Sequence, residues 1–218
     1  MSKLLEEKAR IEADLLAKNP RCAQFLYHGN SNSTYLRKLT PHFSHTAVND
    51  DRGEYVFASE DFLTAALYTL KSSDDDDFRY DLQRIGGFRK DKKCAMYAMV
   101  GDYAALTKKL SVGHVYGVYE HEFFNADRYG SEKIALKPVR TRFAVAVDSP
   151  VDLMESGVQI FSIRDEYTAG EIDENLSYMV QQSAQEYAFR EILLPNKMIS
   201  WVNKDLGIPI PDGPMADW

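Results

Sequence analysis

The chain has 218 residues and a mass of 24.9 kDa, which fits one domain with short additions, and its 44% hydrophobic content is enough for a sizeable core. There are 26 basic and 33 acidic residues, so the net charge is -7 and the pI is near 5.3. This balance argues against broad, non-specific binding of nucleic acid but leaves room for a local basic groove. No apolar run approaches the ~20 residues that span a bilayer, so we expect a cytoplasmic protein with no membrane partner.

An amphipathic helix is expected over residues 2–18, where leucine and isoleucine recur at helical spacing and Asn19 and Pro20 end the pattern. Its polar face carries acids as well as bases, which favours a helix that covers the protein over one that lies on a membrane. Residues 1–20 are therefore expected to form an N-terminal covering helix.

Residues 25–30, FLYHGN, are predicted to form a strand that is closed by glycine. His28 lies near the end of this strand, and Gly29 leaves the backbone bare, so that a ligand can approach its peptide group closely. Taken alone, His28 is better explained as an ordinary histidine that is hydrogen-bonded beside a turn. The functional interpretation therefore depends on the motifs that follow.

Residues 31–53 show little periodicity and are expected to form a long functional loop. The loop contains His42 and His45, but two histidines without a third clear ligand are weak evidence for a metal. Cys22 and Cys94 lie far apart and lack the spacing of a metal site. We therefore predict no metal ion.

A short strand that leads directly into a helix is predicted over residues 54–68, EYVFASEDFLTAALY. Strand-forming residues come first, Ser59 is placed to accept a hydrogen bond from the first free helix amides, and the acids after it suit the positive helix start. Phe57 and Tyr68 are eleven residues apart, which places Tyr68 about three turns into the helix. Both rings are then expected to face one cleft.

The rest of the chain reads as strands with few helices between them, which indicates an α+β protein and not a doubly wound sheet. Strands are predicted at residues 95–100, 114–121, 134–147 and 158–163, and helices at 102–110 and 173–182. A final strand begins near Glu186. Because Glu186 and Glu191 are an odd number of residues apart, an unbroken strand points them to opposite faces, and only one of them can serve a given cleft.

Three stretches together resemble the ADP-ribosyltransferase superfamily, in the branch that includes diphtheria-type toxins and poly(ADP-ribose) polymerases. Tyr27-His28-Gly29 is similar to its opening motif, a histidine followed by glycine at a strand end. The stretch from Phe57 to Tyr68 is similar to its strand–helix motif, in which two aromatics flank the nicotinamide. Residues 183–187, SAQEY, are similar to its closing motif, in which a glutamate followed by tyrosine opens a strand.

The resemblance implies the fold of that superfamily, in which two packed, antiparallel-rich β-sheets carry flanking helices. We expect this domain to span residues 21–202. The remaining residues, 203–218, are then expected to form a C-terminal tail.

The resemblance also implies roles for the site residues, with NAD⁺ as the substrate. Phe57 and Tyr68 would hold the cationic nicotinamide ring by stacking and cation–π attraction. The backbone N–H and C=O of Gly29 would bind its carboxamide, and His28 would bind a ribose hydroxyl of the adenosine half. Glu186 would be the catalytic carboxylate, placing negative charge where an oxocarbenium-like transition state becomes positive.

The sequence departs from the family pattern at three places. Phe57 stands where this branch usually has a tyrosine, which keeps the stacking surface and loses a hydroxyl; Tyr55, on the same strand face, is the nearest substitute. Asn30 replaces the hydroxyl residue often found after the glycine. Ala184 replaces the glutamine or glutamate that is typical of the arginine-modifying and guanine-modifying branches.

We therefore expect an NAD⁺-dependent ADP-ribosyltransferase, a glycosyltransferase that moves ADP-ribose to a macromolecular acceptor, either protein or RNA/DNA. The resemblance implies a bacterial or phage-type toxin or effector, with an antitoxin protein as a possible partner. Two alternatives stay open. One is a catalytically inactive module of the same fold that binds NAD or a partner, and the other is an NAD-dependent RNA 2′-phosphotransferase.

Overall fold

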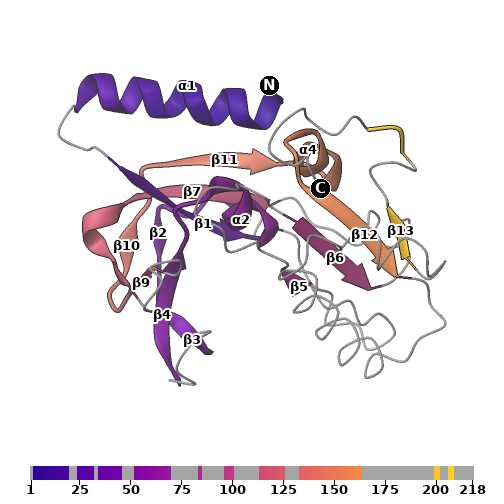
Figure 1. The fold of residues 1–218 in the computed structure, drawn as a ribbon. Helices are drawn as coiled ribbons and strands as arrows, with labels where there is room; N and C mark the ends of the chain where they lie inside the picture. Colours follow the sequence, from indigo (N-terminus) through magenta and orange to yellow (C-terminus); the bar gives the residue numbers. More distant parts are fainter. Residues whose placement is uncertain are drawn as a thin grey trace. The chain divides into compact units, whose positions relative to one another are not determined.

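The computed structural model describes residues 2–19, 24–31, 34–45, 52–69, 83–84, 96–100, 113–125, 133–163, 199–201 and 206–208. The chain divides into two compact units, Met1–Lys71 with Ser111–Asp148 and Ser72–Leu110 with Ser149–Trp218. The described residues form several small, mostly antiparallel sheets and few helices (Figure 1). The predicted α+β class is confirmed at this level.

The first unit contains a three-stranded antiparallel sheet in the order β1-β7-β11. Strand β1 (Phe25–Asn30) has the predicted bounds, β7 (Gly113–Tyr119) lies at its centre, and β11 (Phe143–Val147) forms the far edge. A short 3₁₀ turn, η1 (Glu120–Glu122), follows β7. Residues of β1 alternate between the two faces, so Leu26 and His28 share one face and Tyr27 and Gly29 the other.

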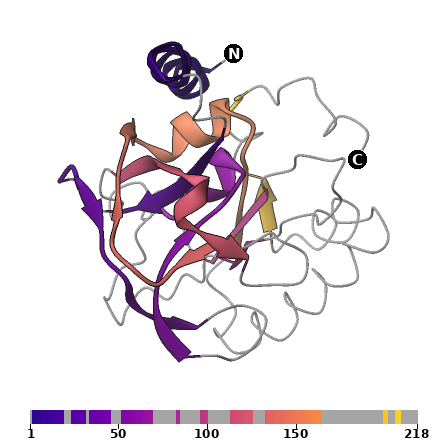
Figure 2. The same cartoon turned by 90° about the vertical axis from the view of Figure 1, so that its left-hand side faces the viewer.

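Helix α1 (Lys3–Lys18) confirms the predicted covering helix and packs along β11 (Figure 1), and Figure 2 shows it end-on. Ser2 caps the helix by accepting a hydrogen bond from the Leu5 amide at 3.3 Å. The Tyr27 hydroxyl donates to Glu12 Oε1 at 2.6 Å, and Lys8 Nζ lies 2.8 Å from Glu12 Oε2. Burial and this hydrogen bond raise the pKa of Tyr27, so the hydroxyl stays protonated as a donor. The helix is therefore attached directly to the strand that carries His28.

A second antiparallel sheet has the order β3-β4-β9-β8. Its strands are β3 (His42–His45), β4 (Arg52–Ala58), β9 (Lys133–Ala135) and β8 (Phe124–Asn125). Beside it, β2 (Lys38–Leu39) pairs with β10 (Val139–Arg140). The expectation of a continuous loop over residues 31–53 was wrong, because β2 and β3 lie within it. The single strand predicted at 134–147 was also wrong, because turns divide it into β9, β10 and β11.

Apolar side chains from both sheets and from the β2–β10 pair form one buried cluster. Its members include Leu26 of β1, Val56 of β4, Tyr116 of β7 and Val139 of β10. Tyr116 is fully buried, and its hydroxyl accepts a hydrogen bond from the Leu36 amide at 3.0 Å. This cluster fixes β4 against the face of β1 that carries His28.

Helix α2 (Phe62–Leu67) follows β4 as predicted, but it is shorter than expected. Asp61 caps it by accepting a hydrogen bond from the Thr64 amide at 2.7 Å. Ser59, the predicted cap, instead accepts from the Asp61 amide at 3.0 Å. Since six residues make fewer than two turns, the expectation that Tyr68 lies three turns into the helix was wrong; Tyr68 is the C-terminal cap.

The second unit contains a four-stranded sheet in the order β13-β12-β6-β5. Its strands are β5 (Gln83–Arg84), β6 (Met96–Val100), β12 (Gln159–Ile163) and β13 (Ile199–Trp201), and β12 runs parallel to β6. The strands predicted at 95–100 and 158–163 are confirmed as β6 and β12. Helix α4 (Pro150–Glu155), which the sequence pattern did not predict, begins after Ser149, whose amide donates to Asp152 Oδ2 at 2.9 Å.

Several predictions concern residues outside the described part of the chain. These are the helices at 102–110 and 173–182, the strand near Glu186 and most of the C-terminal tail. Among the helices that the structure describes, none is both long enough and apolar enough to cross a membrane.

Candidate functional site

The end of β1 contacts both elements of the predicted strand–helix motif. His28 Nδ1 lies 2.6 Å from the carbonyl oxygen of Phe57 on β4. Because a carbonyl oxygen only accepts hydrogen bonds, Nδ1 must be the protonated nitrogen in this contact. In a neutral imidazole the other nitrogen, Nε2, is then an acceptor. The contact thus fixes both the position and the tautomer of His28.

The surroundings of His28 favour its neutral form. Burial lowers the pKa of the imidazole below its ordinary value, the hydrogen bond to Phe57 partly opposes this shift, and His42 lowers the pKa further. A neutral ring near pH 7 keeps the lone pair on Nε2 available. His28 is therefore prepared to accept a hydrogen bond from a hydroxyl or amide group.

Gly29 is needed where β1 passes α2. A Cβ atom added at Gly29 would lie 2.9 Å from Tyr68 Cβ and would overlap the carbonyl oxygen of Ala65. Both Ala65 and the neighbouring Ala66 are buried, so the helix presents small residues where the strand approaches. The absence of a side chain at Gly29 thus permits close packing of strand and helix, a role that the sequence interpretation did not include.

The peptide groups of Gly29 face the open edge of β1. Tyr27 donates to Ser59 O at 2.8 Å and accepts from Ser59 N at 2.9 Å, so its N–H and C=O point away from β7. Gly29 lies two residues further along the strand, and its N–H and C=O therefore point to the same side. The described residues form no second bridge between β1 and β4. Gly29 consequently presents one donor and one acceptor beside each other.

Phe57 belongs to a row of aromatic rings on one face of the β3–β4 pair. Its ring centroid is 5.8 Å from that of Tyr55 and 6.2 Å from that of His42, with edge-to-face geometry in both contacts. His42 and Tyr55 are direct cross-strand partners. These contacts hold the Phe57 ring in place on the exposed face of the sheet.

The Tyr55 hydroxyl does not replace the hydroxyl that Phe57 lacks. A Cβ atom added at Gly53 would overlap this hydroxyl, so the Tyr55 side chain lies back over Gly53. Gly53 is toward the start of β4, and the contact with His28 is near its end. The tyrosine oxygen is therefore directed away from the end of β1.

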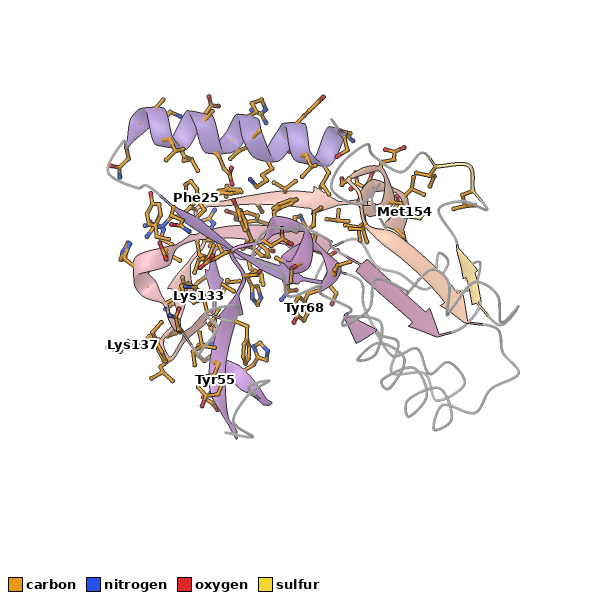
Figure 3. The ribbon with its side chains drawn as sticks, in the orientation of Figure 1. Phe25, Tyr55, Tyr68, Lys133, Lys137 and Met154 are labelled. Carbon is orange, nitrogen blue, oxygen red and sulfur yellow. The ribbon has the colours of Figure 1, made fainter. Side chains whose placement is uncertain are left out.

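Helix α2 is held at its start by contacts with two strands. Lys133 of β9 is buried, and its Nζ lies 2.9 Å from Glu60 Oε1 and 2.7 Å from Asn125 Oδ1. The Phe62 ring packs edge-on against Tyr27 at 5.4 Å. These contacts determine where Tyr68 lies, at the end of α2 on the side away from α1 (Figure 3). The Tyr68 side chain is 45% exposed.

Four of the five predicted site residues thus lie in one region of the first unit. The structure brings His28 to Phe57 and Gly29 to Tyr68. That the two rings face one cleft stays a prediction. The fifth residue, Glu186, lies outside the described residues, as does Glu191.

Sequence reasoning missed the place of His42. Its position in an expected loop suggested at most a metal ligand, whereas the structure places it on β3, opposite Tyr55 and against Phe57. The apolar and polar residues of HFSH gave no clear alternation, so the pairing of β3 with β4 was the missing information. Among the described residues no three His, Cys, Asp or Glu side chains form a possible metal cluster, and the absence of a metal ion stays a prediction.

No protein-family model, no curated protein and no solved structure matches this chain. The geometry of the site itself therefore carries the functional proposal.

Proposed function

We propose that this protein is an NAD⁺-dependent ADP-ribosyltransferase with the fold of that superfamily, two packed antiparallel-rich sheets with flanking helices. One observation carries the proposal. The end of β1 contacts both parts of the strand–helix motif, through His28 to Phe57 and through Gly29 to the Ala65–Tyr68 end of α2. Two of the three stretches that suggested the family from sequence thus meet at adjacent residues of β1.

The edge of β1 supports binding of the nicotinamide carboxamide. A primary carboxamide carries one carbonyl acceptor and an NH₂ donor, and the N–H and C=O of Gly29 are complementary to it. Two parallel hydrogen bonds fix the plane of the nicotinamide ring as well as its position. Phe57, whose carbonyl binds His28, and Tyr68, whose Cβ lies close to Gly29, supply aromatic rings for a cationic ligand, with an attraction of about 0.5 to 2 kcal/mol.

His28 supports binding of a ribose hydroxyl. Its Nδ1–H is engaged by Phe57, and Nε2 of the neutral ring is an acceptor, so a hydroxyl group is a suitable partner. A protonated histidine would offer only donors. The lowered pKa therefore matches the role of an acceptor for the adenosine ribose.

The reaction would break the bond between the nicotinamide nitrogen and C1′ of the ribose, and nicotinamide would leave with the bonding electron pair. A lone pair on the acceptor would form the new bond to C1′, and the acceptor would lose a proton. Positive charge develops on the sugar in the transition state, as in glycoside cleavage. We propose that Glu186 stabilises this charge and positions the ribose hydroxyl.

The first experiment measures nicotinamide release from NAD⁺ by the purified protein. Glu186→Gln removes the charge with almost no change in shape, and we expect release to fall about 100- to 1,000-fold, the usual cost of one preorganised electrostatic contact. Glu191→Gln is the matched control and should have a mild effect, because an unbroken strand would point Glu191 to the face opposite Glu186. Equal loss in both variants, or in neither, would count against the assignment of Glu186.

A binding module without activity is the second candidate, and one observation favours it. Phe57 has no hydroxyl, and the Tyr55 hydroxyl lies over Gly53 instead of replacing it. Such a module would bind NAD⁺ without releasing nicotinamide. Calorimetric binding together with the release assay separates the two candidates. If the protein is an active enzyme, we propose that it is a toxin or effector that modifies a macromolecular acceptor and that an antitoxin protein is its partner.

A further inference from the structure

Exposed cationic side chains gather on the β2–β10 pair and its flanking residues. We call this group the basic ribbon; it consists of Arg37, Lys38, Lys137 and Arg140. All four residues are exposed, and none forms an ion pair with another described residue. In a chain with 33 acidic and 26 basic residues, a group of four cations with no acidic partner among the described residues is not expected from composition. Figure 3 shows Lys137 at the outer margin of the first unit.

The strand register places like charges opposite each other. Lys38 pairs directly with Arg140, while Leu39 pairs with Val139. Leu39 and Val139 are buried in the core, so the two cations share the opposite, outward face. Like charges in directly opposed positions destabilise a strand pair. An anion bound between them would remove this repulsion.

The basic ribbon is fixed to the core before any ligand arrives. The Tyr116 hydroxyl donates to Thr34 O at 3.3 Å and accepts from Leu36 N. The Thr141 hydroxyl donates to Leu36 O at 2.8 Å, and its amide donates to Arg37 O at 3.2 Å. Binding therefore does not need to order this backbone, which lowers its entropic cost.

An exposed aromatic residue, Tyr35, lies two positions before Arg37 in the sequence. Tyr35 is 48% exposed, and its ring is 5.9 Å from the ring of the buried Tyr116, which supports it from below. Surfaces that bind single-stranded nucleic acid combine aromatic rings with basic side chains. The bases stack on the rings, and the phosphates pair with the cations. An acidic polypeptide would use the cations but would gain nothing from the ring.

We propose that the basic ribbon and Tyr35 bind single-stranded nucleic acid, and that this nucleic acid is the acceptor of ADP-ribose. The second part rests on the proposed function, and the first part does not. Lys38 and His42 are four positions apart in the sequence, so their Cα atoms are at most about 14 Å apart. The His42 ring lies 6.2 Å from the Phe57 ring. A single-stranded nucleic acid bound to the basic ribbon would thus lie close to the candidate nicotinamide site.

The binding test uses the full-length protein and short fluorescein-labelled oligo(dT) and oligo(U), followed by fluorescence anisotropy at several salt concentrations. The variant Lys38→Gln/Arg140→Gln removes two cations from the basic ribbon. The matched control, Arg10→Gln/Lys18→Gln, removes two exposed cations from α1. Unlabelled polyglutamate serves as the competing acidic polypeptide.

Each phosphate contact on a single-stranded nucleic acid contributes about 0.7 to the slope of log affinity against log salt concentration. The ribbon variant lacks two cations, so the magnitude of its slope should be smaller by about 1.4. If affinities converge near about 1 M salt, this loss corresponds to about 25-fold weaker binding at about 0.1 M salt. The α1 control should bind like the unaltered protein. Tyr35→Leu should weaken oligonucleotide binding about fivefold or more, also at high salt, because stacking is not screened.

Three results would overturn the binding proposal. The first is an equal loss of oligonucleotide affinity in the α1 control variant. The second is displacement of the labelled oligonucleotide by polyglutamate at the same charge concentration at which unlabelled oligonucleotide displaces it. The third is an unchanged oligonucleotide affinity in Tyr35→Leu. Of the two oligonucleotides, the one that binds more tightly identifies DNA or RNA as the source of the strand.

The acceptor role is tested with labelled NAD⁺ by following both label on the oligonucleotide and free nicotinamide. We expect the ribbon variant to lose oligonucleotide labelling at least in proportion to its affinity, while nicotinamide release to water stays unchanged. Release without any labelling in the unaltered protein would overturn the acceptor role and leave the proposed function intact. Absence of release in every sample would instead refute the proposed function, and the oligonucleotide affinities would still decide the binding proposal.

Discussion

Replacing Gly29 by alanine tests the close packing of β1 on α2. The added Cβ would overlap the Ala65 carbonyl oxygen and lie 2.9 Å from Tyr68 Cβ. These are backbone and near-backbone atoms, so relief requires movement of the helix and not rotation of a side chain. Overpacking of this kind costs about 1 to 3 kcal/mol. Alanine also reduces the freedom of the unfolded chain, which offsets about 0.4 to 1 kcal/mol.

The net expectation for Gly29→Ala is a loss of about 1 to 2 kcal/mol of stability. For a chain of this size, that corresponds to a decrease in Tm of roughly 2 to 8 °C. Because α2 carries Tyr68, the same movement should weaken NAD⁺ binding, although no group that touches NAD⁺ is removed. Thermal unfolding monitored by circular dichroism gives the first quantity, and calorimetric titration with NAD⁺ gives the second.

Gly53→Ala is the matched control, since it adds the same methyl group to a strand glycine of the same unit. The three atoms nearest to its Cβ would all belong to the far end of the Tyr55 side chain, which can rotate away. We expect a change of less than about 1 kcal/mol. If Gly29→Ala were as stable as the unaltered protein, or Gly53→Ala were equally damaging, the described approach of β1 to α2 would be refuted.

Two further predictions concern residues of β1. The pKa of His28 is lowered in the folded protein, so the unfolded chain binds its proton more readily; stability is complete above about pH 6.5 and falls as the pH decreases through that value toward the lowered pKa. NAD⁺ affinity should fall only at lower pH, where the folded protein itself takes up the proton as the pH passes the lowered pKa of His28, and His28→Gln should remove this dependence. Tyr27→Phe leaves Glu12 without its hydroxyl donor and should cost about 1 kcal/mol in chemical unfolding, with little further loss when Glu12→Gln is added.

Local signals in the sequence were sufficient for α1, β1 and the transition from β4 to α2. Helix α1 has a clear apolar period, and Ser2 and Asn19 mark its ends. Strand-forming residues followed by glycine or by helix-capping residues marked β1 and the end of β4. The length of α2 was overestimated because the spacing of Phe57 and Tyr68 also fits a short helix followed by its cap. Residue spacing alone does not distinguish the two cases.

The errors arose where structure depends on distant pairing. Strand β3 has no strong periodicity of its own and is defined by its partner β4. The apolar residues from 134 to 147 suggested one strand, but Pro138 lies in the turn between β9 and β10, and these two strands pair with different partners. The hydrogen bond from His28 to Phe57 likewise joins residues far apart in sequence, so only the fold revealed which nitrogen of His28 is an acceptor.

The single bridge between Tyr27 and Ser59 also bears on self-association. Unpaired strand edges invite pairing with another chain, and proteins usually keep them short or covered. Beyond the bridge, β1 exposes the donor and acceptor of Gly29 just before the strand ends at Asn30, while α2 lies against the glycine. A β-strand of another chain would need a longer row of unpaired backbone N–H and C=O groups to pair with β1. A single amide group needs only the N–H and C=O of Gly29. The same edge thus fits the proposed amide ligand and is poorly suited to aggregation.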